Sequence, residues 1–234
     1  MKKIILTILA CASFFSPFLS KAQDFFDTSD PEKFFVLGAR VGFNTSNRTF
    51  PKGNFVNHTE TSWGTGFNAG AVANLNIKEY FSLQPGFFYE SRSSNLINIA
   101  DYKALNIYGG RQETYYEKDH LRAYYFTIPI MGIVKFNLAE NIKWNVELGP
   151  YIQFTLKQNG QNNVIILHKP NNNYAHYVAR QNSFDFGFKM GSSLTFHNKY
   201  YLGFHYLAGV CHVWKSPSGG NNRSWQFSIG YDFY

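Results

Sequence analysis

Charged residues are scarce in this chain of 234 residues, since Asp, Glu, Lys and Arg together make up only 16% of it. Soluble domains average about 25% charged residues, so an ordinary water-facing surface is disfavoured. Beyond the first 22 residues, no segment holds the roughly 20 apolar residues that a membrane-spanning helix needs. Apart from Cys11 near the start, the only cysteine is Cys211, which excludes a disulfide within the rest of the chain.

Aromatic residues, in contrast, are abundant and make up 19% of the chain. A sequence rich in Phe and Tyr, poor in charge and without long apolar helices is typical of β-strands in a membrane. In lipid every backbone N–H and C=O group needs a partner within the protein, and a closed β-barrel meets this demand without helices. The composition therefore favours a single barrel domain, for which the chain is long enough.

The first 22 residues have the pattern of a secretory signal peptide. Residues 1–3 are a short basic start, residues 4–15 are an uncharged apolar run, and Ser20-Lys21-Ala22 ends the segment with small residues at two positions that a signal peptidase reads. We predict cleavage before Gln23. A membrane anchor and a lipoprotein site at Cys11 are the alternatives, but the apolar run is short for an anchor and Ala22 offers the better cleavage site.

Eight later segments alternate apolar and polar residues with the period of two that indicates β-strands. In the first of them Phe35, Leu37 and Val41 share one face, while Arg40 and Asn44 share the other. The segments lie at about 35–44, 67–76, 81–90, 124–136, 144–155, 184–194, 202–211 and 224–233. We therefore predict an all-β, eight-stranded antiparallel transmembrane barrel over residues 34–234, preceded by a periplasmic segment, residues 23–33.

The connections between these segments alternate in length. Short turns are expected near 78–79, 137–141 and 197–199, and long loops over 45–62, 93–120, 157–179 and 214–223. Short periplasmic turns and long extracellular loops are typical of barrels in the outer membrane of Gram-negative bacteria. With an even number of strands, both chain ends are expected in the periplasm.

A soluble lipocalin-like barrel also closes eight strands, with apolar side chains inside and polar ones outside. Three features favour the membrane instead. One face of each segment is nearly free of charge, and the opposite face is too polar and too rich in glycine for a soluble core. Aromatic residues also cluster at the predicted strand ends, as interfacial girdles require, at Tyr80, Phe81, Tyr124, Tyr125, Tyr200, Tyr201, Phe233 and Tyr234.

Several short pieces, in order along the chain, carry a resemblance to a known family. They are Phe81–Tyr89 (FSLQPGFFY), Ile128-Pro129, Gly149-Pro150-Tyr151, Asp185-Phe186-Gly187 and the closing Gly230–Phe233 (GYDF). From about residue 34 onward the chain resembles the outer-membrane β-barrel proteins of Bacteroidetes that are called PorT-like or porin-family proteins.

The resemblance implies an eight-stranded barrel in the cell outer membrane, in contact with lipid and lipopolysaccharide and usually without an assigned activity. Its aromatic closing strand implies the barrel-assembly machinery as a partner. One namesake in the family is linked to protein secretion, but no feature of this sequence singles out that role.

Inward-facing positions of the predicted strands carry several ionisable side chains. The interior of an eight-stranded barrel is just wide enough for side chains to fill, and an unpaired buried charge is costly. We therefore expect opposite charges to pair and to plug the lumen, although a narrow ion path or a buried ligand site is the alternative. The predicted structural network comprises Arg40, Glu90, Arg92, Lys135, Glu147, Asp185, Lys189, His205 and Asp232.

The third and fourth long loops carry basic residues and no acidic ones. Such loops would attract anionic lipopolysaccharide or glycans, unless they are simply solvated. The candidate anion-binding residues are Lys157, Lys169, Arg180, Lys215 and Arg223.

The sequence offers little that points to catalysis or to a cofactor. The histidines lack the spacing of metal ligands, and no G-x-S-x-G nucleophile motif is present. We predict no cofactor, no metal and no nucleic acid partner. The sequence thus favours a small barrel with a structural, surface-binding or secretion- or assembly-accessory role, and not a large open pore. A narrow-lumen transport or ligand-binding barrel is the alternative, and an outer-membrane hydrolase comes third.

Overall fold

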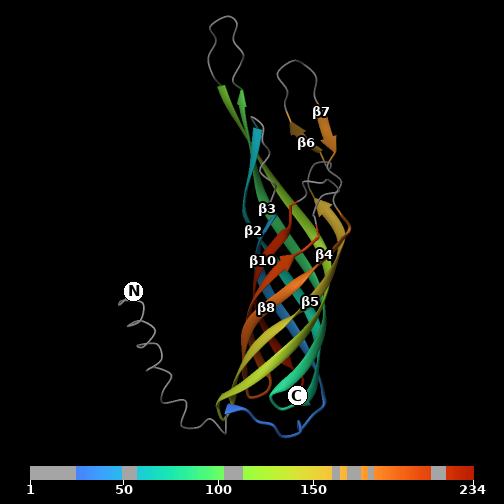
Figure 1. Ribbon diagram of the computed structural model, residues 1–234, viewed down its shortest axis with the longest axis vertical. Helices are drawn as coiled ribbons and strands as arrows, with labels where there is room; N and C mark the ends of the chain where they lie inside the picture. The colour runs from blue at the N-terminus through green and yellow to red at the C-terminus, as the bar shows by residue number, and fades with distance from the viewer. Residues whose placement is uncertain are drawn as a thin grey trace, which may run out of the picture.

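Eight strands close into one antiparallel barrel in the computed structural model, which describes residues 25–48, 57–102, 113–159, 164–167, 175–178, 182–211 and 220–234. The barrel order is β1-β10-β9-β8-β5-β4-β3-β2, and β1 pairs with both β10 and β2 (Figure 1). Strands β6 and β7 form a separate small sheet. The strands are β1 (Phe35–Arg48), β2 (Asn57–Lys78), β3 (Phe81–Tyr102), β4 (Glu113–Ala139), β5 (Ile142–Asn159), β6 (Val164–Leu167), β7 (Ala175–Val178), β8 (Phe184–Phe196), β9 (Tyr200–Gly209) and β10 (Asn222–Asp232).

The predicted alternation of faces is confirmed in all eight barrel strands. On β1, for example, Phe43 is 62% exposed on the outside while its neighbour Asn44 is 1% exposed on the inside. The outward side chains along the described strands are mainly Phe, Leu, Val, Ile and Trp, whereas the buried set is dominated by polar and charged residues. Apolar side chains outside and polar ones inside is the reverse of a soluble barrel. The lipocalin-like alternative is therefore wrong.

The three predicted short turns are confirmed at Glu79-Tyr80, Glu140-Asn141 and residues 197–199. In the last of these, His197 and Asn198 adopt positive φ angles of 51° and 56°, a left-handed conformation in which Asn and His are enriched among the non-glycine residues. These turns lie at the same end of the barrel as the C-terminus (Figure 1). We call this end the turn end and the opposite one the loop end.

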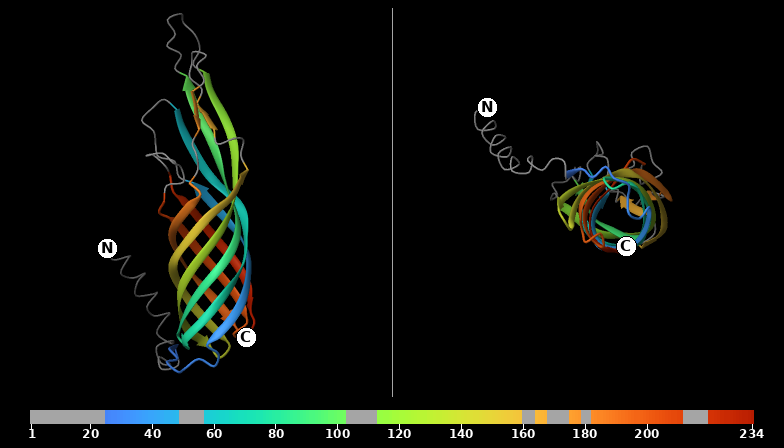
Figure 2. Two further views of the ribbon diagram at one scale, coloured as in Figure 1. Left: turned by 90° about the vertical axis from the view of Figure 1, so that its right-hand side faces the viewer. Right: turned by 90° about the horizontal axis from the view of Figure 1, so that it is seen from below.

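Strands β2, β3 and β4 extend far beyond the barrel at the loop end (Figure 2). Pairing between β3 and β4 continues to Tyr102 and Glu113, so the prediction of a long loop over 93–120 is wrong for most of that segment. Beyond the membrane the outward face of a strand no longer meets lipid, so the apolar outer face that reveals a strand in the sequence is no longer needed there. The predicted loops at 45–62 and 157–179 likewise contain strand residues, among them Thr45–Arg48 of β1 and the β6–β7 pair.

The predicted aromatic girdles are only partly correct. Tyr124 and Tyr200 lie on the outside, but their neighbours Tyr125 and Tyr201 are 1% and 7% exposed and point into the barrel. Adjacent residues of a strand face opposite sides, so such a pair cannot place both rings in lipid. Glycine makes room for the inward rings, since a Cβ atom on Gly203 would collide with the Tyr201 ring.

A charge placed on the outward face should destabilise the barrel according to its depth. Val41, midway along β1, is 53% exposed, and Ile77, at the turn end of β2, is 51% exposed. We expect Val41→Arg to lower the free energy of unfolding in phospholipid vesicles by about 2–4 kcal/mol and Ile77→Arg by at most about 1 kcal/mol. Equal effects in urea titrations of the two variants would contradict a lipid-facing surface.

Candidate functional site

The structure places all nine predicted interior residues on the inner face of the barrel. Eight of them are at most 7% exposed, and Lys135 is half-buried. They form several clusters and not one continuous network. The clusters are described in order from the loop end to the turn end.

The cluster nearest the loop end is built around Arg92. Its Nε donates a hydrogen bond of 2.8 Å to Oε2 of Glu90, whose Oε1 accepts one of 3.0 Å from Gln226. The Arg92 guanidinium also lies over the Tyr125 ring, 5.5 Å from its centroid. Nη2 of Arg48 donates to the Tyr125 hydroxyl at 2.8 Å, a bridge across the lumen because β1 and β4 are not neighbours. The sequence prediction missed Arg48 by placing it in a loop, although it continues the inward parity of Asn44.

The middle cluster centres on Glu147 of β5. Its carboxylate accepts hydrogen bonds from the Ser193 hydroxyl and, at 3.2 Å, from the Tyr201 hydroxyl, and it lies 2.7 Å from Nε2 of His205. The serine hydroxyl is directed to the carboxylate and not to the imidazole, so these residues do not form the serine–imidazole pair of a Ser-His-Asp site. Asp185 is not part of this cluster and accepts a hydrogen bond from the Asn222 amide at 3.0 Å. No Ser-His-Asp arrangement is therefore assembled from these residues.

Toward the turn end, Arg40 forms the ion pair that joins the first and last strands. Its Nη2 lies 2.7 Å from Oδ1 of Asp232, with the two side chains 3% and 8% exposed. The guanidinium stacks over the Tyr201 ring at 4.0 Å, and Asn74 donates a further hydrogen bond of 3.3 Å to Asp232. This cluster ties β1, β2, β9 and β10 together.

Two of the predicted interior cations have no carboxylate partner within hydrogen-bonding distance among the described residues, so the expectation that all charges pair is wrong for them. Nζ of Lys189 lies over the Phe88 ring at 4.9 Å. Nζ of Lys135 donates to the amide oxygen of Asn76 at 2.7 Å. An aromatic face and an amide oxygen take the place of a carboxylate at these two positions.

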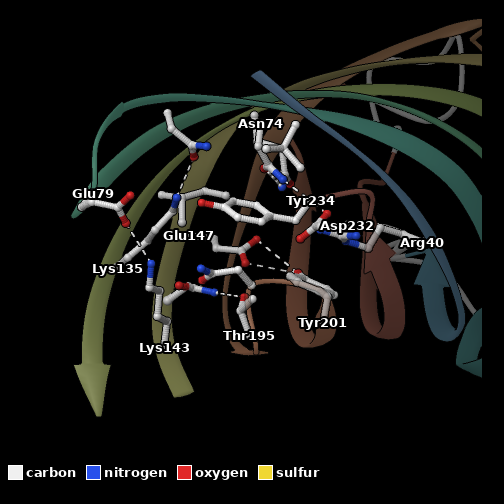
Figure 3. A pocket seen from close by; sticks show the side chains of 16 residues that line it. Arg40, Asn74, Glu79, Lys135, Lys143, Glu147, Thr195, Tyr201, Asp232 and Tyr234 are labelled. Carbon is white, nitrogen blue, oxygen red and sulfur yellow. Dashed lines mark hydrogen bonds and ion pairs between the residues drawn. The ribbon is translucent and has the colours of Figure 1, made fainter. Parts of the chain in front are cut away.

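A cavity of about 50 Å³ opens at the turn end, with room for about three or four water molecules. Lys135, Lys143 and Glu79 lie on one side of it, and Arg40 and Asp232 lie on the other (Figure 3). The Lys143 ammonium is 2.8 Å from the Glu79 carboxylate. The sequence prediction did not include Lys143 and Glu79, although Lys143 shares the inward parity of Glu147. Among the described residues, no group of three or more His, Cys, Asp and Glu side chains could hold a metal ion.

The matching family model describes an outer membrane protein beta-barrel domain and covers residues 21–213. The chain belongs to this family. Membership agrees with the eight-stranded architecture and places the barrel in the outer membrane. Among curated proteins, none matches this sequence significantly. The described residues include no helix that is long and apolar enough to span a membrane.

Solved outer-membrane barrels are similar to this family member at low identity. Ail of Yersinia pestis, in complex with the heparin analogue sucrose octasulfate, is 12% identical, with 86% of this chain and 100% of that chain covered and a TM-score of 0.39. OprG of Pseudomonas aeruginosa is 8% identical, with 89% and 100% covered and a TM-score of 0.49. LpxR of Salmonella typhimurium is 8% identical, with 93% and 95% covered and a TM-score of 0.30. At these values the similarities say nothing about the ligands of this barrel.

The candidate surface cations of this outer-membrane barrel are not gathered into one site by the described residues. Lys157 and Arg223 are exposed, but they lie on β5 and β10, toward the loop end, and not in loops. Strands β8 and β9 separate them in the barrel. Lys169, Arg180 and Lys215 lie outside the described residues.

Breaking the Arg40–Asp232 pair should strongly destabilise the barrel, because it leaves one buried charge without its partner. We expect Arg40→Met and Asp232→Asn each to lower the free energy of unfolding by about 3–5 kcal/mol, and the double variant to lose less than the sum. Urea titrations in phospholipid vesicles measure these values. Lys78→Met removes the exposed ion pair with Asp30 and serves as a control without a measurable change. If the losses of unfolding free energy in the two single variants add up to the loss in the double variant, Arg40 and Asp232 are not energetically coupled.

The ion pair between Lys143 and Glu79 at the turn end makes the free energy of unfolding depend on pH. Burial tends to raise the pKa of Glu79, but the hydrogen bond and the charge of Lys143 and the N–H of Glu32 together lower it below the ordinary value of 4.5. A lowered pKa means that this stabilisation is complete above pH 4.5 and is lost as the pH falls through the folded-state value. Between pH 5 and pH 3 the wild type should therefore lose more stability than Glu79→Gln, by less than about 1 kcal/mol. Parallel unfolding curves for the two proteins across this range would contradict the prediction.

Proposed function

We propose that this protein is a closed, non-conducting outer-membrane scaffold that presents an extracellular surface for binding. The observation that carries this proposal is the set of side-chain bridges through the lumen. Arg48 of β1 reaches Tyr125 of β4, and Gln226 of β10 reaches Glu90 of β3, although neither pair of strands is adjacent. Bridges between opposite walls leave no wide aqueous path. The interior charges act in this proposal as structural elements and not as transport groups.

The part of the molecule offered to partners is the long sheet of β2, β3 and β4 above the barrel (Figure 2). In the proposed orientation the turn end faces the periplasm, and this sheet stands outside the cell. Lys157 and Arg223 are exposed toward the same end, and with Lys169, Arg180 and Lys215 they form the proposed contact with anionic lipopolysaccharide or glycans. A non-enzymatic role agrees with the unassembled Ser-His-Asp arrangement.

The finer assignments from the sequence belong to the same proposal. They are a cleaved signal peptide over residues 1–22, which lie outside the described residues, a periplasmic segment over 23–33 and a barrel domain over 34–234. The described N-terminal residues lie at the turn end with the C-terminus, as that division requires. The barrel-assembly machinery as a partner and a place among the PorT-like proteins of Bacteroidetes rest on the motifs alone.

Ligand binding or narrow transport within the lumen is the second candidate, favoured by the cavity at the turn end. Through-transport would require the bridges above that cavity to break.

Planar-bilayer recording of the refolded mature protein tests the scaffold proposal against transport through the lumen. In about 1 M salt we expect no stable conductance steps above those of the protein-free bilayer. The reason is that the bridged lumen excludes hydrated ions. A heat-dependent shift in gel mobility must first show that the sample is folded. Reproducible single-channel steps from folded wild-type protein would overturn the scaffold proposal and favour transport.

A further inference from the structure

Residues 25–34, here called the strap, are hydrogen-bonded to residues that line the cavity at the turn end. Asn76 donates a hydrogen bond of 2.8 Å to the Lys33 carbonyl, and the Tyr234 hydroxyl donates one of 2.8 Å to Glu32. The Glu32 N–H in turn donates to Glu79 at 3.3 Å. Asn76, Glu79 and Tyr234 all line the cavity, so the strap is anchored directly on its rim.

Aromatic contacts hold the start of the strap against the barrel. The rings of Phe25 and Phe26 lie 5.0 Å and 4.9 Å from the ring of Phe136, and Phe26 also meets Tyr80 at 6.2 Å. These contacts lie at the barrel end and not inside the lumen, so they leave the cavity itself free.

The carboxylates that line the cavity already have close cationic or imidazole partners. Glu79 is paired with Lys143 at 2.8 Å, and Asp232 with Arg40 at 2.7 Å. Glu147, deeper in the lumen, contacts His205 at 2.7 Å.

Lys135 is the cation of this lining that lacks such a partner among the described residues. Of the three N–H donors of its ammonium, one is directed to the neutral Asn76 amide at 2.7 Å. Lys143 lies on the same side of the cavity (Figure 3). The two ammonium groups there face the single carboxylate of Glu79, which leaves this side with an excess of positive charge.

We propose that the cavity at the turn end, beside the strap, binds a small oxyanion, a phosphate or a carboxylate group, with Lys135 as the main ligand and Lys143 as the second. An oxyanion supplies the counter-charge and the acceptors that the half-buried ammonium lacks. The cavity is small, about 50 Å³, so the proposed ligand is a single small group. This site lies at the opposite end from the proposed extracellular binding surface and does not depend on it.

Titration of inorganic phosphate into the refolded, full mature protein tests the site. The protein is held in a maltoside detergent, which contains no phosphate, and is followed by NMR. We expect saturable shifts of the Asn76 and Lys135 signals in the wild type, at least tenfold weaker binding in Lys135→Met, and retained binding in Lys135→Arg. Arg122→Met removes an exposed cation from the same strand as Lys135, toward the loop end of β4, and should bind phosphate like the wild type.

Three results would overturn the proposal: no saturable binding to the wild type, unchanged binding in Lys135→Met, or an equal loss in Arg122→Met. Gel mobility before and after heating shows for each variant that a loss of binding is not a loss of folding. Repeating the titration in nanodiscs with and without phosphatidylglycerol identifies the source of the oxyanion. Competition by this lipid would assign the site to a headgroup, and undiminished phosphate binding would assign it to a free anion.

Discussion

The closure of the hydrogen-bonded ladder between β1 and β10 is the constraint on which the rest of the structure depends. Register pairs run from Gly38 and Asp232 at one end to Arg48 and Asn222 at the other, so the first and last strands leave no open edge over this length. In a membrane an unpaired backbone edge would cost several kcal/mol for each exposed group. Closure allows Phe, Leu and Val to face lipid, and it places every alternate residue in a narrow interior.

The interior that closure creates is shielded from lipid and, away from the cavity at the turn end, largely from water, so its polar side chains must find partners within a small radius. The Arg40–Asp232 pair links the closure of the backbone ladder to the pairing of interior charges, because it joins the same two strands whose pairing closes the ladder. Tyr201 connects this pair to Glu147, because its ring stacks on the Arg40 guanidinium and its hydroxyl donates a hydrogen bond to the Glu147 carboxylate. Inward glycines such as Gly203 give these rings their space. The resulting bridges cross the lumen, and the scaffold proposal rests on them.

The two ends of the barrel differ because they meet different demands. At the turn end, short connections, the strap and the C-terminal Tyr234 gather around one polar cavity. At the loop end, β2, β3 and β4 continue beyond the membrane, where pairing between strands is no longer tied to an apolar outer face. Surface for partners and a site for small ions can therefore coexist at opposite ends of the same closed barrel.

The amino-acid sequence by itself determined the eight barrel strands, the inward face of the predicted charged residues and the short turns, because a period of two is a local property that water and lipid impose on each strand. It did not show that Tyr125 and Tyr201 point inward together with the charges, or that Arg48 belongs to a strand. Only the tertiary structure decided which inward residues meet, such as Glu147 with His205 and Arg48 with Tyr125, 58 and 77 residues apart in the chain. Alternation gives the face of the strand on which a residue lies but not its position along the barrel axis. The relative positions of residues on different strands are set by the register of the strands when the barrel closes.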